Sequence, residues 1–193
     1  WKAIENLDKE LENFEAAITR RGAKVIWAEN AAEALEAVKK ICEEKNCKTL
    51  VKSKSMVTEE IHLNAFLEKN VIEGVETDLG EYIQQLDGEP PYHIVTPAMH
   101  KSKEDVAKLF ANKLGTDPAL TPQQLTAVAR DILREKFSKA EVGVTGANFI
   151  ISDIGGIAVT ENEGNARLSC SFPKTHIVIA GIEKMIPTMN DLA

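Results

Sequence analysis

Four polar residues, Lys52-Ser53-Lys54-Ser55, lie between a short apolar run and a segment with helical periodicity. Two ammonium groups, two hydroxyls and the free N–H groups of a helix start favour binding of an anion such as a carboxylate or phosphate. The alternative is that Ser55 only caps the helix, while Glu59 and Glu60 pair with the lysines at the surface. Neither GxxxxGK[ST] nor GxGxxG occurs, so neither a P-loop nor a typical dinucleotide site is predicted.

Carboxylates and a histidine follow two further predicted strands. Glu76-Thr77-Asp78 ends one of them, and its carboxylates suit ribose hydroxyls or acid–base chemistry, although Asp78 equally suits the cap of the next helix. His100 comes soon after another strand, where a side chain that titrates near neutral pH favours catalytic proton transfer. The alternative for His100 is a hydrogen-bonded surface group. The histidines lack metal-ligand spacing, so no metal site is predicted.

The stretch from Gly143 to His176 combines glycines, small polar residues and charges around two short apolar runs. Its glycines permit tight turns and close approach of the backbone to a ligand. The candidate binding residues here are Thr145, Gly146, Asn148, Asn162, Gly164 and Lys174, with Glu161 as a candidate catalytic carboxylate. The alternative is a hairpin with a polar turn and a solvated loop. We expect this stretch to form one wall of a pocket opposite residues 52–55, with Asp78 and His100 between them, all at strand ends of one sheet.

Short strands that alternate with longer helices are expected to position these residues. Hydrophobic spacing predicts strands and helices in turn as far as Thr96. The predicted strands are 24–28, 49–52, 71–77 and 93–96, and the predicted helices are 2–20, 30–46, 57–69 and 79–86. This alternation is typical of an α/β fold with a mostly parallel sheet and helices on both faces.

The pattern changes after Pro97, where two helices look like an insertion between the halves of the sheet. Ser102 caps the first, which Gly115 ends, and the Thr121-Pro122-Gln123-Gln124 capping box begins the second. Further strands are predicted at 148–152, 157–160 and 175–180, the first two joined as a hairpin that makes the sheet partly mixed. We expect a single domain over 1–193, with an N-terminal helix within 1–22 and the helical insertion at 102–140.

Composition excludes some classes of function. The 193 residues are 44% hydrophobic and 27% charged, with a net charge of -7. This acidic balance argues against nonspecific nucleic-acid binding. No apolar run approaches ~18 residues, so no membrane span is predicted. Cys42, Cys47 and Cys170 form no CxxC pair, and a separation of five positions between Cys42 and Cys47 at a helix end is poor geometry for a disulfide or metal pair. Structural thiols and a cytoplasmic location are therefore expected.

Five segments, in order along nearly the whole chain, resemble a known family. They are VKSKSMVTEEI (51–61), ETDLGEYI (76–83), GEPPYHIVTPAMHK (88–101), GVTGANFIISDIGGIAVTENEGN (143–165) and FPKTHIVIAGIEKMIPT (172–188). They resemble the lactate utilization protein B family in its lactate-utilisation (LUD) domain. The resemblance implies a fold like that of CoA transferases and ribose-5-phosphate isomerase. It also implies a part in oxidising L-lactate to pyruvate, within a multi-component complex whose subunits would be its partners.

The same resemblance bears on cofactors and on the reaction. Family members carry two 4Fe-4S clusters in a C-terminal region that would begin where this sequence ends, so no cofactor is expected within these residues. The expected ligand is a small carboxylate, lactate or pyruvate, or another anion. Residues 160–164, TENEG, are similar to the segment in which CoA transferases carry a nucleophilic glutamate, with an extra glutamate before the glycine. The alternative function is therefore a CoA- or nucleotide-dependent transferase or ligase that uses Glu161.

Overall fold

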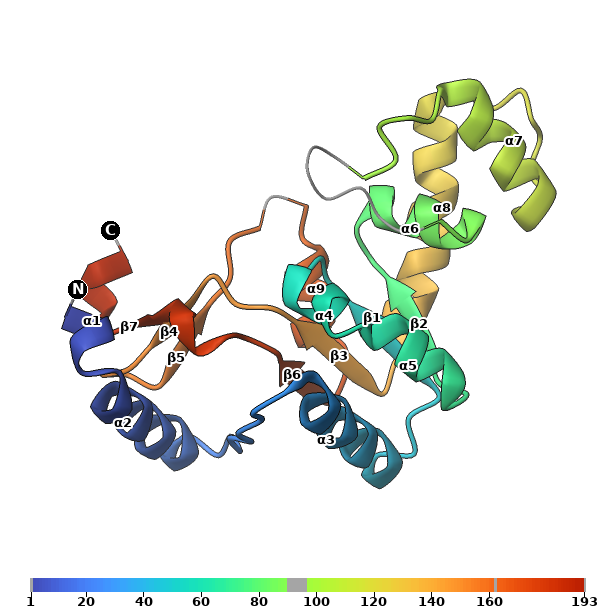
Figure 1. Ribbon diagram of the computed structural model, residues 1–193. Coiled ribbons are helices and arrows are strands. Elements are labelled where there is room, and N and C mark those ends of the chain that lie inside the picture. The colour runs from blue at the N-terminus through green and yellow to red at the C-terminus, as the bar shows by residue number, and fades with distance from the viewer. Residues whose placement is uncertain (1, 90–96, 162, 193) are drawn as a thin grey trace.

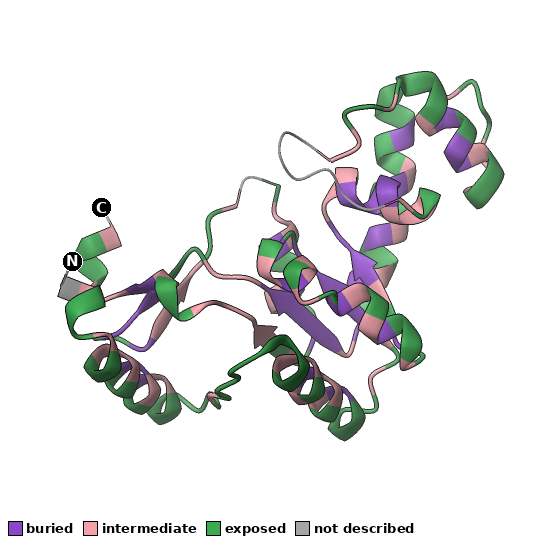
Figure 2. Ribbon diagram, viewed as in Figure 1, coloured by how far each residue is buried: buried purple, intermediate pink, exposed green. Residues whose placement is uncertain are grey.

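The computed structural model describes residues 2–89, 97–161 and 163–192, and its central feature is a four-stranded parallel sheet. The order is β2-β1-β3-β6, with every neighbouring pair parallel. The strands are β1 (Thr49–Lys52), β2 (Glu73–Glu76), β3 (Val142–Thr145) and β6 (Thr175–Val178). The mostly parallel α/β architecture predicted from the alternation of elements is confirmed, and its two central strands, β1 and β3, are almost entirely buried (Figure 2).

Helices cover both faces of this sheet because alternate strand residues point to opposite sides. Leu50 and Val142 face one side, where they pack with α3 (Ala31–Glu44) and α5 (Leu63–Lys69). Val51 and Val75 face the other side and pack with the helices between β2 and β3. Those helices are α6 (Leu79–Asp87), α7 (Lys103–Leu114) and α8 (Pro122–Lys139). The helical pair at 102–140 thus belongs to the crossover from β2 to β3, and both of its helices begin with the expected capping boxes.

A second, three-stranded sheet lies to the left of the first in Figure 1. The hairpin β4 (Phe149–Ile151) and β5 (Gly156–Ala158) is antiparallel as predicted, and β7 (Met185–Ile186) pairs with β4 in parallel. Helix α2 (Leu7–Arg20) packs on it through Phe14. Gly155 has φ +58° and lies so close to α2 that a Cβ would come within 2.4 Å of the Ile18 nitrogen. The expectation of one partly mixed sheet is therefore wrong: the hairpin belongs to a separate sheet.

The remaining elements are short. They are α1 (Lys2–Glu5), α4 (Met56–Glu60), α9 (Asn165–Ser171) and two 3-10 helices, η1 (Ile182–Lys184) and η2 (Met189–Leu192). The helix predicted over 57–69 is interrupted at His62, which adopts φ 57° and separates α4 from α5. Within the described ranges, no helix combines the length and apolar character needed to cross a membrane.

Two strand predictions have different outcomes. Residues 24–28 form no strand, because the segment has no neighbouring strand to share backbone hydrogen bonds with and leaves Trp27 48% exposed. The strand predicted at 93–96 lies outside the described residues. Strand β3 and helix α9 were not expected, because Gly143 and Asn165 are poor formers of strands and helices.

Candidate functional site

The carboxyl ends of β1 and β3 mark the place where the crossover direction of the parallel sheet reverses. The chain passes from β1 to its neighbour β2 on one side, and then returns across β1 to β3 on the other. In open α/β sheets, ligands bind in the crevice outside the carboxyl ends of the strands at such a point. The segments that leave β1, β2 and β3 here include several of the residues singled out in the sequence.

Lys52 does not face this edge as a free ammonium group. It is the last residue of β1, is 1% exposed, and its Nζ lies 2.9 Å from Oε1 of Glu76, the residue paired with it at the end of β2. Asn64 of α5 donates to the same Oε1 at 2.6 Å. The Lys52 charge is thus already balanced by a buried carboxylate, and the part of Lys52 in anion binding stays a prediction.

Two more glutamates complete what we call the buried charge cluster, formed by Lys52, Glu59, Glu76 and Glu81. Glu81 of α6 is 2% exposed, and burial, followed by the charge of Glu76, raises its pKa to about 9. Glu81 is thus protonated at neutral pH and can share its proton with the Glu76 carboxylate. Burial raises the pKa of Glu59 to about 7, against the opposing charge of Lys52. The raised pKa values mean that Glu81 carries a proton at neutral pH and that Glu59 titrates close to neutral pH.

Sequence reasoning missed Glu59 and Glu81 as members of a site, because it placed Glu59 at the surface and did not consider Glu81. A signal for the cluster did exist. Leu50 and Lys52 are two positions apart in β1 and therefore point to the same face of the sheet. Strands β1 and β2 are both four residues long, and they end in a lysine and a glutamate. Parallel pairing in register makes those charges neighbours within the sheet.

The edge itself is formed by what we call the carboxyl-end site, consisting of Lys54, Ser55, Asp78, Gly146 and Glu163. Lys54 is exposed, and the loop that holds it is anchored by Ser53, whose N–H donates to the Val144 carbonyl at 3.0 Å. Ser55 caps α4 by accepting from Thr58 N. A Cβ on Gly146 would lie 2.8 Å from Ser55 Oγ, so the glycine lets the segment after β3 approach the segment after β1.

Asp78 and Glu163 bring two carboxyl groups to the same edge. Asp78 caps α6 by accepting from the N–H groups of Gly80 and Glu81, at 3.0 and 3.2 Å. Glu163 approaches from the segment before α9. Its pKa is raised by burial and by the charge and hydrogen bonding of Asp78, against the opposing charge of Lys54. The structure thus brings together one ammonium group and two interacting carboxyl groups, and Glu163 was not among the predicted site residues.

Other predicted residues are used for structure at their positions. Glu161 accepts from Arg167 N at 2.9 Å and lies 3.4 Å from Arg167 Nε, so its carboxylate is bound to α9. Gly164, with φ +81°, immediately precedes that helix. Asn148 accepts from Thr160 N at 2.7 Å and closes the hairpin. Thr145 is buried, with Oγ1 2.9 Å from His176 Nε2 on the side of α9. Asn162 lies outside the described residues.

Two predicted residues lie away from the carboxyl-end site. His100 is 2.8 Å from Glu89, which follows Gly88 at the C-terminal end of α6, whereas Asp78 is at the opposite end of that helix. Lys174 immediately precedes β6 and so lies at the amino edge of the parallel sheet. The structure thus does not bring His100 or Lys174 together with residues 52–55.

Metal ligands are not grouped in this part of the chain. Among the described residues, no three or more histidine, cysteine, aspartate or glutamate side chains are placed to hold a metal ion. The thiols also do not fit an iron–sulfur cluster, which needs four: Cys42 and Cys47 belong to the α3 side of the sheet, and Cys170 lies on α9 at the opposite face.

Comparison with known proteins identifies the family. The LUD domain model matches residues 11–193. The chain belongs to the LUD domain family. This LUD domain is 46% identical over 189 residues to the lactate utilization protein B of Oceanobacillus iheyensis, which covers 98% of the chain. It is 46% identical to the proteins of the same name from Bacillus pumilus and Bacillus subtilis, over 98% and 97% of the chain. It spans about 40% of the length of these relatives. No solved structure was found to match it.

Proposed function

We propose that this LUD domain is the substrate-handling part of a protein that takes part in oxidising L-lactate to pyruvate within a multi-component complex. The observation that carries the proposal is its 46% identity, over nearly the whole chain, to proteins named lactate utilization protein B. A lactate-utilisation role follows directly from those names. The reaction, oxidation of L-lactate to pyruvate, and membership of a complex are what we propose beyond those names.

The carboxyl-end site has the groups that a small 2-hydroxy acid requires. Lys54 is the exposed ammonium group of this edge and would pair with the lactate carboxylate. Asp78 or Glu163 would accept the hydrogen bond of the 2-hydroxyl. Ser55 and Gly146 hold the two loops together beside Lys54.

Oxidation of L-lactate to pyruvate releases two electrons and two protons. The carboxylate of Asp78 or Glu163 would take up a proton, and Glu59 of the buried charge cluster shares with Glu163 the neighbouring charge of Lys54. The electrons need an acceptor, for which the family resemblance implies 4Fe-4S clusters in the part of the relatives beyond this span. These residues would thus bind and orient the substrate and receive protons.

The proposal is tested in two arms. In the first, millimolar L-lactate or pyruvate is expected to raise the melting temperature of this chain by about 5–10 °C near saturation, since ~100-fold excess over Kd adds ~2.7 kcal/mol. Lys54→Ala should abolish the shift, whereas Lys113→Ala, on the exposed end of α7, should keep it. In the second, Lys54→Ala in the full-length protein with its partner subunits should remove most lactate-dependent reduction of an electron acceptor. Intact activity in that variant would overturn the site assignment.

A further inference from the structure

Cys42 and Cys47 are brought together by the way α3 ends. Cys47 N donates to the Cys42 carbonyl at 2.8 Å, and Asn46 N donates to the Glu43 carbonyl at 3.1 Å. Asn46 adopts φ 51°. These are the two hydrogen bonds and the left-handed residue of a Schellman motif, which places the side chains three positions before and two after the helix cap in contact. Both cysteines are free thiols, as the sequence analysis expects, but the Schellman motif brings them closer together than a continuous helix or an extended chain would.

The two thiols interact directly. Their interaction lowers the pKa of Cys42 and raises the pKa of Cys47. The Cys47 thiol donates to the Thr49 carbonyl oxygen, with Sγ and O 3.5 Å apart. Cys42 is 1% exposed, whereas Cys47 is partly exposed. The outer sulfur is therefore the one that a reagent would meet first, and the inner sulfur lies directly behind it.

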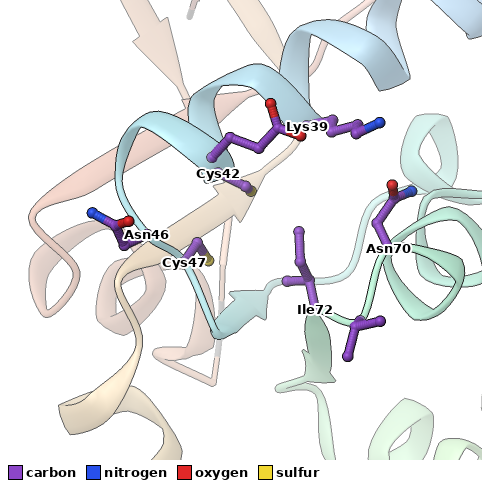
Figure 3. A pocket seen from close by; sticks show the side chains of 8 residues that line it. Lys39, Cys42, Asn46, Cys47, Asn70 and Ile72 are labelled. Atoms are coloured by element: carbon purple, nitrogen blue, oxygen red, sulfur yellow. The ribbon is translucent and has the colours of Figure 1, made fainter.

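Both thiols line an open pocket of about 340 Å³ at the amino edge of the parallel sheet (Figure 3). Figure 3 shows their side chains at the end of α3, with Asn70 and Ile72 across the pocket. The opposite wall is a second Schellman motif, at the end of α5, in which Val71 N donates to Glu68 O at 3.1 Å and Ile72 N to Leu67 O at 3.0 Å. The pocket thus lies between two helix ends of the same type.

Val71 is the strained residue of this wall. It adopts φ 60° and is 91% exposed. A left-handed conformation is a genuine outlier for a β-branched residue, and such strain concentrates at functional sites. Val71 is the left-handed residue that ends α5 in the second Schellman motif, so its conformation fixes the shape of this wall of the pocket.

We propose that Cys42 and Cys47 are a redox-active dithiol that reacts with a low-molecular-weight disulfide entering this pocket and forms an intramolecular disulfide. The Cys47 sulfur attacks one sulfur of the reagent and expels the other, and the Cys47 proton goes to the expelled sulfur. The Cys42 sulfur then attacks the Cys47 sulfur and expels the second thiolate. The two protein hydrogens end on the two small thiols, so the reagent is reduced by two electrons and the protein is oxidised by two.

The disulfide formed in this way should be reversible. The ring that it closes contains only six residues, and a short loop gains little from restricting the unfolded chain. Disulfides with little such stabilisation have higher reduction potentials and are labile rather than structural. The proposal does not depend on the lactate-related function.

The test uses cystamine, a small symmetric disulfide, on the reduced chain in its folded state. Cystamine should remove two hydrogens from the pair, so that thiol labelling then finds neither Cys42 nor Cys47 free. Any single added group should lie on Cys170, which is also partly exposed. Trypsin cleaves after Lys45, between the two cysteines, so the fragments ICEEK (41–45) and NCK (46–48) should be recovered as one cross-linked species. Dithiothreitol should restore all three thiols.

Single substitutions separate the steps. Cys170→Ser should leave the cross-link unchanged, Cys47→Ser should make the pocket unreactive, and Cys42→Ser should stop at a stable mixed disulfide on Cys47. Cys47 is partly exposed, so Cys47→Ser is the variant that keeps the test valid if Cys42→Ser fails to fold. A wild-type chain that keeps both thiols free, or that accumulates cystamine adducts without the ICEEK–NCK cross-link, would overturn the proposal.

Discussion

Lys52 and Glu76 are the directly paired last residues of two adjacent parallel strands, and their charged atoms lie 2.9 Å apart in an environment closed to solvent. Two charges cost free energy when they leave water, and their mutual attraction recovers this cost only while both remain. Asn64 and the protonated Glu81 provide further hydrogen bonds to Glu76. The carboxyl end of the β1–β2 pair is therefore stabilised by a group of polar contacts, and removal of one partner leaves the others buried without their counter-charge or hydrogen bond.

Lys52→Met should be strongly destabilising, because it leaves the Glu76 carboxylate buried without its counter-charge. We expect a loss of about 3–5 kcal/mol in the free energy of unfolding, measured with urea at neutral pH. Lys113→Met, at an exposed lysine, should change it by under ~0.5 kcal/mol. The double variant Lys52→Met/Glu76→Gln should recover much of the loss. Equal destabilisation in the single and double variants would show that the pair is not coupled.

Glu81→Gln should flatten the dependence of stability on pH. The folded pKa of Glu81 is raised from 4.5 to about 9, so between these values the folded state binds more protons than the unfolded state. Stability therefore falls as pH rises through this window. Glutamine cannot ionise, so the variant should gain stability relative to wild type as pH increases from about 5 to about 9. Glu135→Gln replaces an exposed carboxylate with a lowered pKa, so its free energy of unfolding should change with pH in parallel to wild type between about pH 5 and 9.

Gly146→Ala should push apart the loops after β1 and β3, because its Cβ would lie 2.8 Å from Ser55 Oγ and 3.2 Å from Ser55 Cβ. We expect a cost of about 1–3 kcal/mol, as for overpacking of a core. Ser55→Gly removes the obstructing side chain and costs only a few tenths of a kcal/mol as a helix cap. The double variant should be clearly less destabilised than the sum of the two, and a strictly additive double-mutant cycle would contradict the contact.

Gln85→Ala should weaken the outer edge of β2. The Gln85 amide donates to Gly74 O at 2.7 Å and accepts from Glu76 N at 3.0 Å, so one side chain satisfies two backbone groups of that strand. Loss of both bonds is expected to cost about 1–3 kcal/mol in chemical denaturation. Gln123→Ala, at an exposed glutamine in the first turn of α8, is the matched control and should stay within ~0.5 kcal/mol of wild type.

Helices with clear caps were predictable from the sequence. Asn30, Asp78, Ser102 and Thr121 each accept a backbone hydrogen bond at the start of the helix expected after them. These signals are local, because a cap and its partner are two or three residues apart. The α/β class followed from them, since helices of this length separated by short apolar runs leave few other arrangements.

The contents of the site were less predictable because they depend on pairing between distant segments. Lys52, Ser55 and Asp78 were found at strand ends, but the order of the strands decides which charges meet. Thus Lys52 is neutralised by Glu76, and Glu163 rather than Glu161 reaches Asp78. Strand direction decides at which edge of the sheet a residue lies. Lys174 precedes β6 and so lies at the opposite edge of the sheet from Lys54, which follows β1.

The connections between the two sheets have a consequence for how the molecule would come apart. The chain passes between them four times, at residues 21–30, 146–148, 159–164 and 179–184 (Figure 1). Trypsin can cut the exposed first passage at Arg21 and Lys24. Such a nick would release no fragment under native conditions, because α2 stays packed on strands that three other passages tie to the parallel sheet. The two sheets are thus interwoven along the chain, and neither can be isolated by trimming from an end.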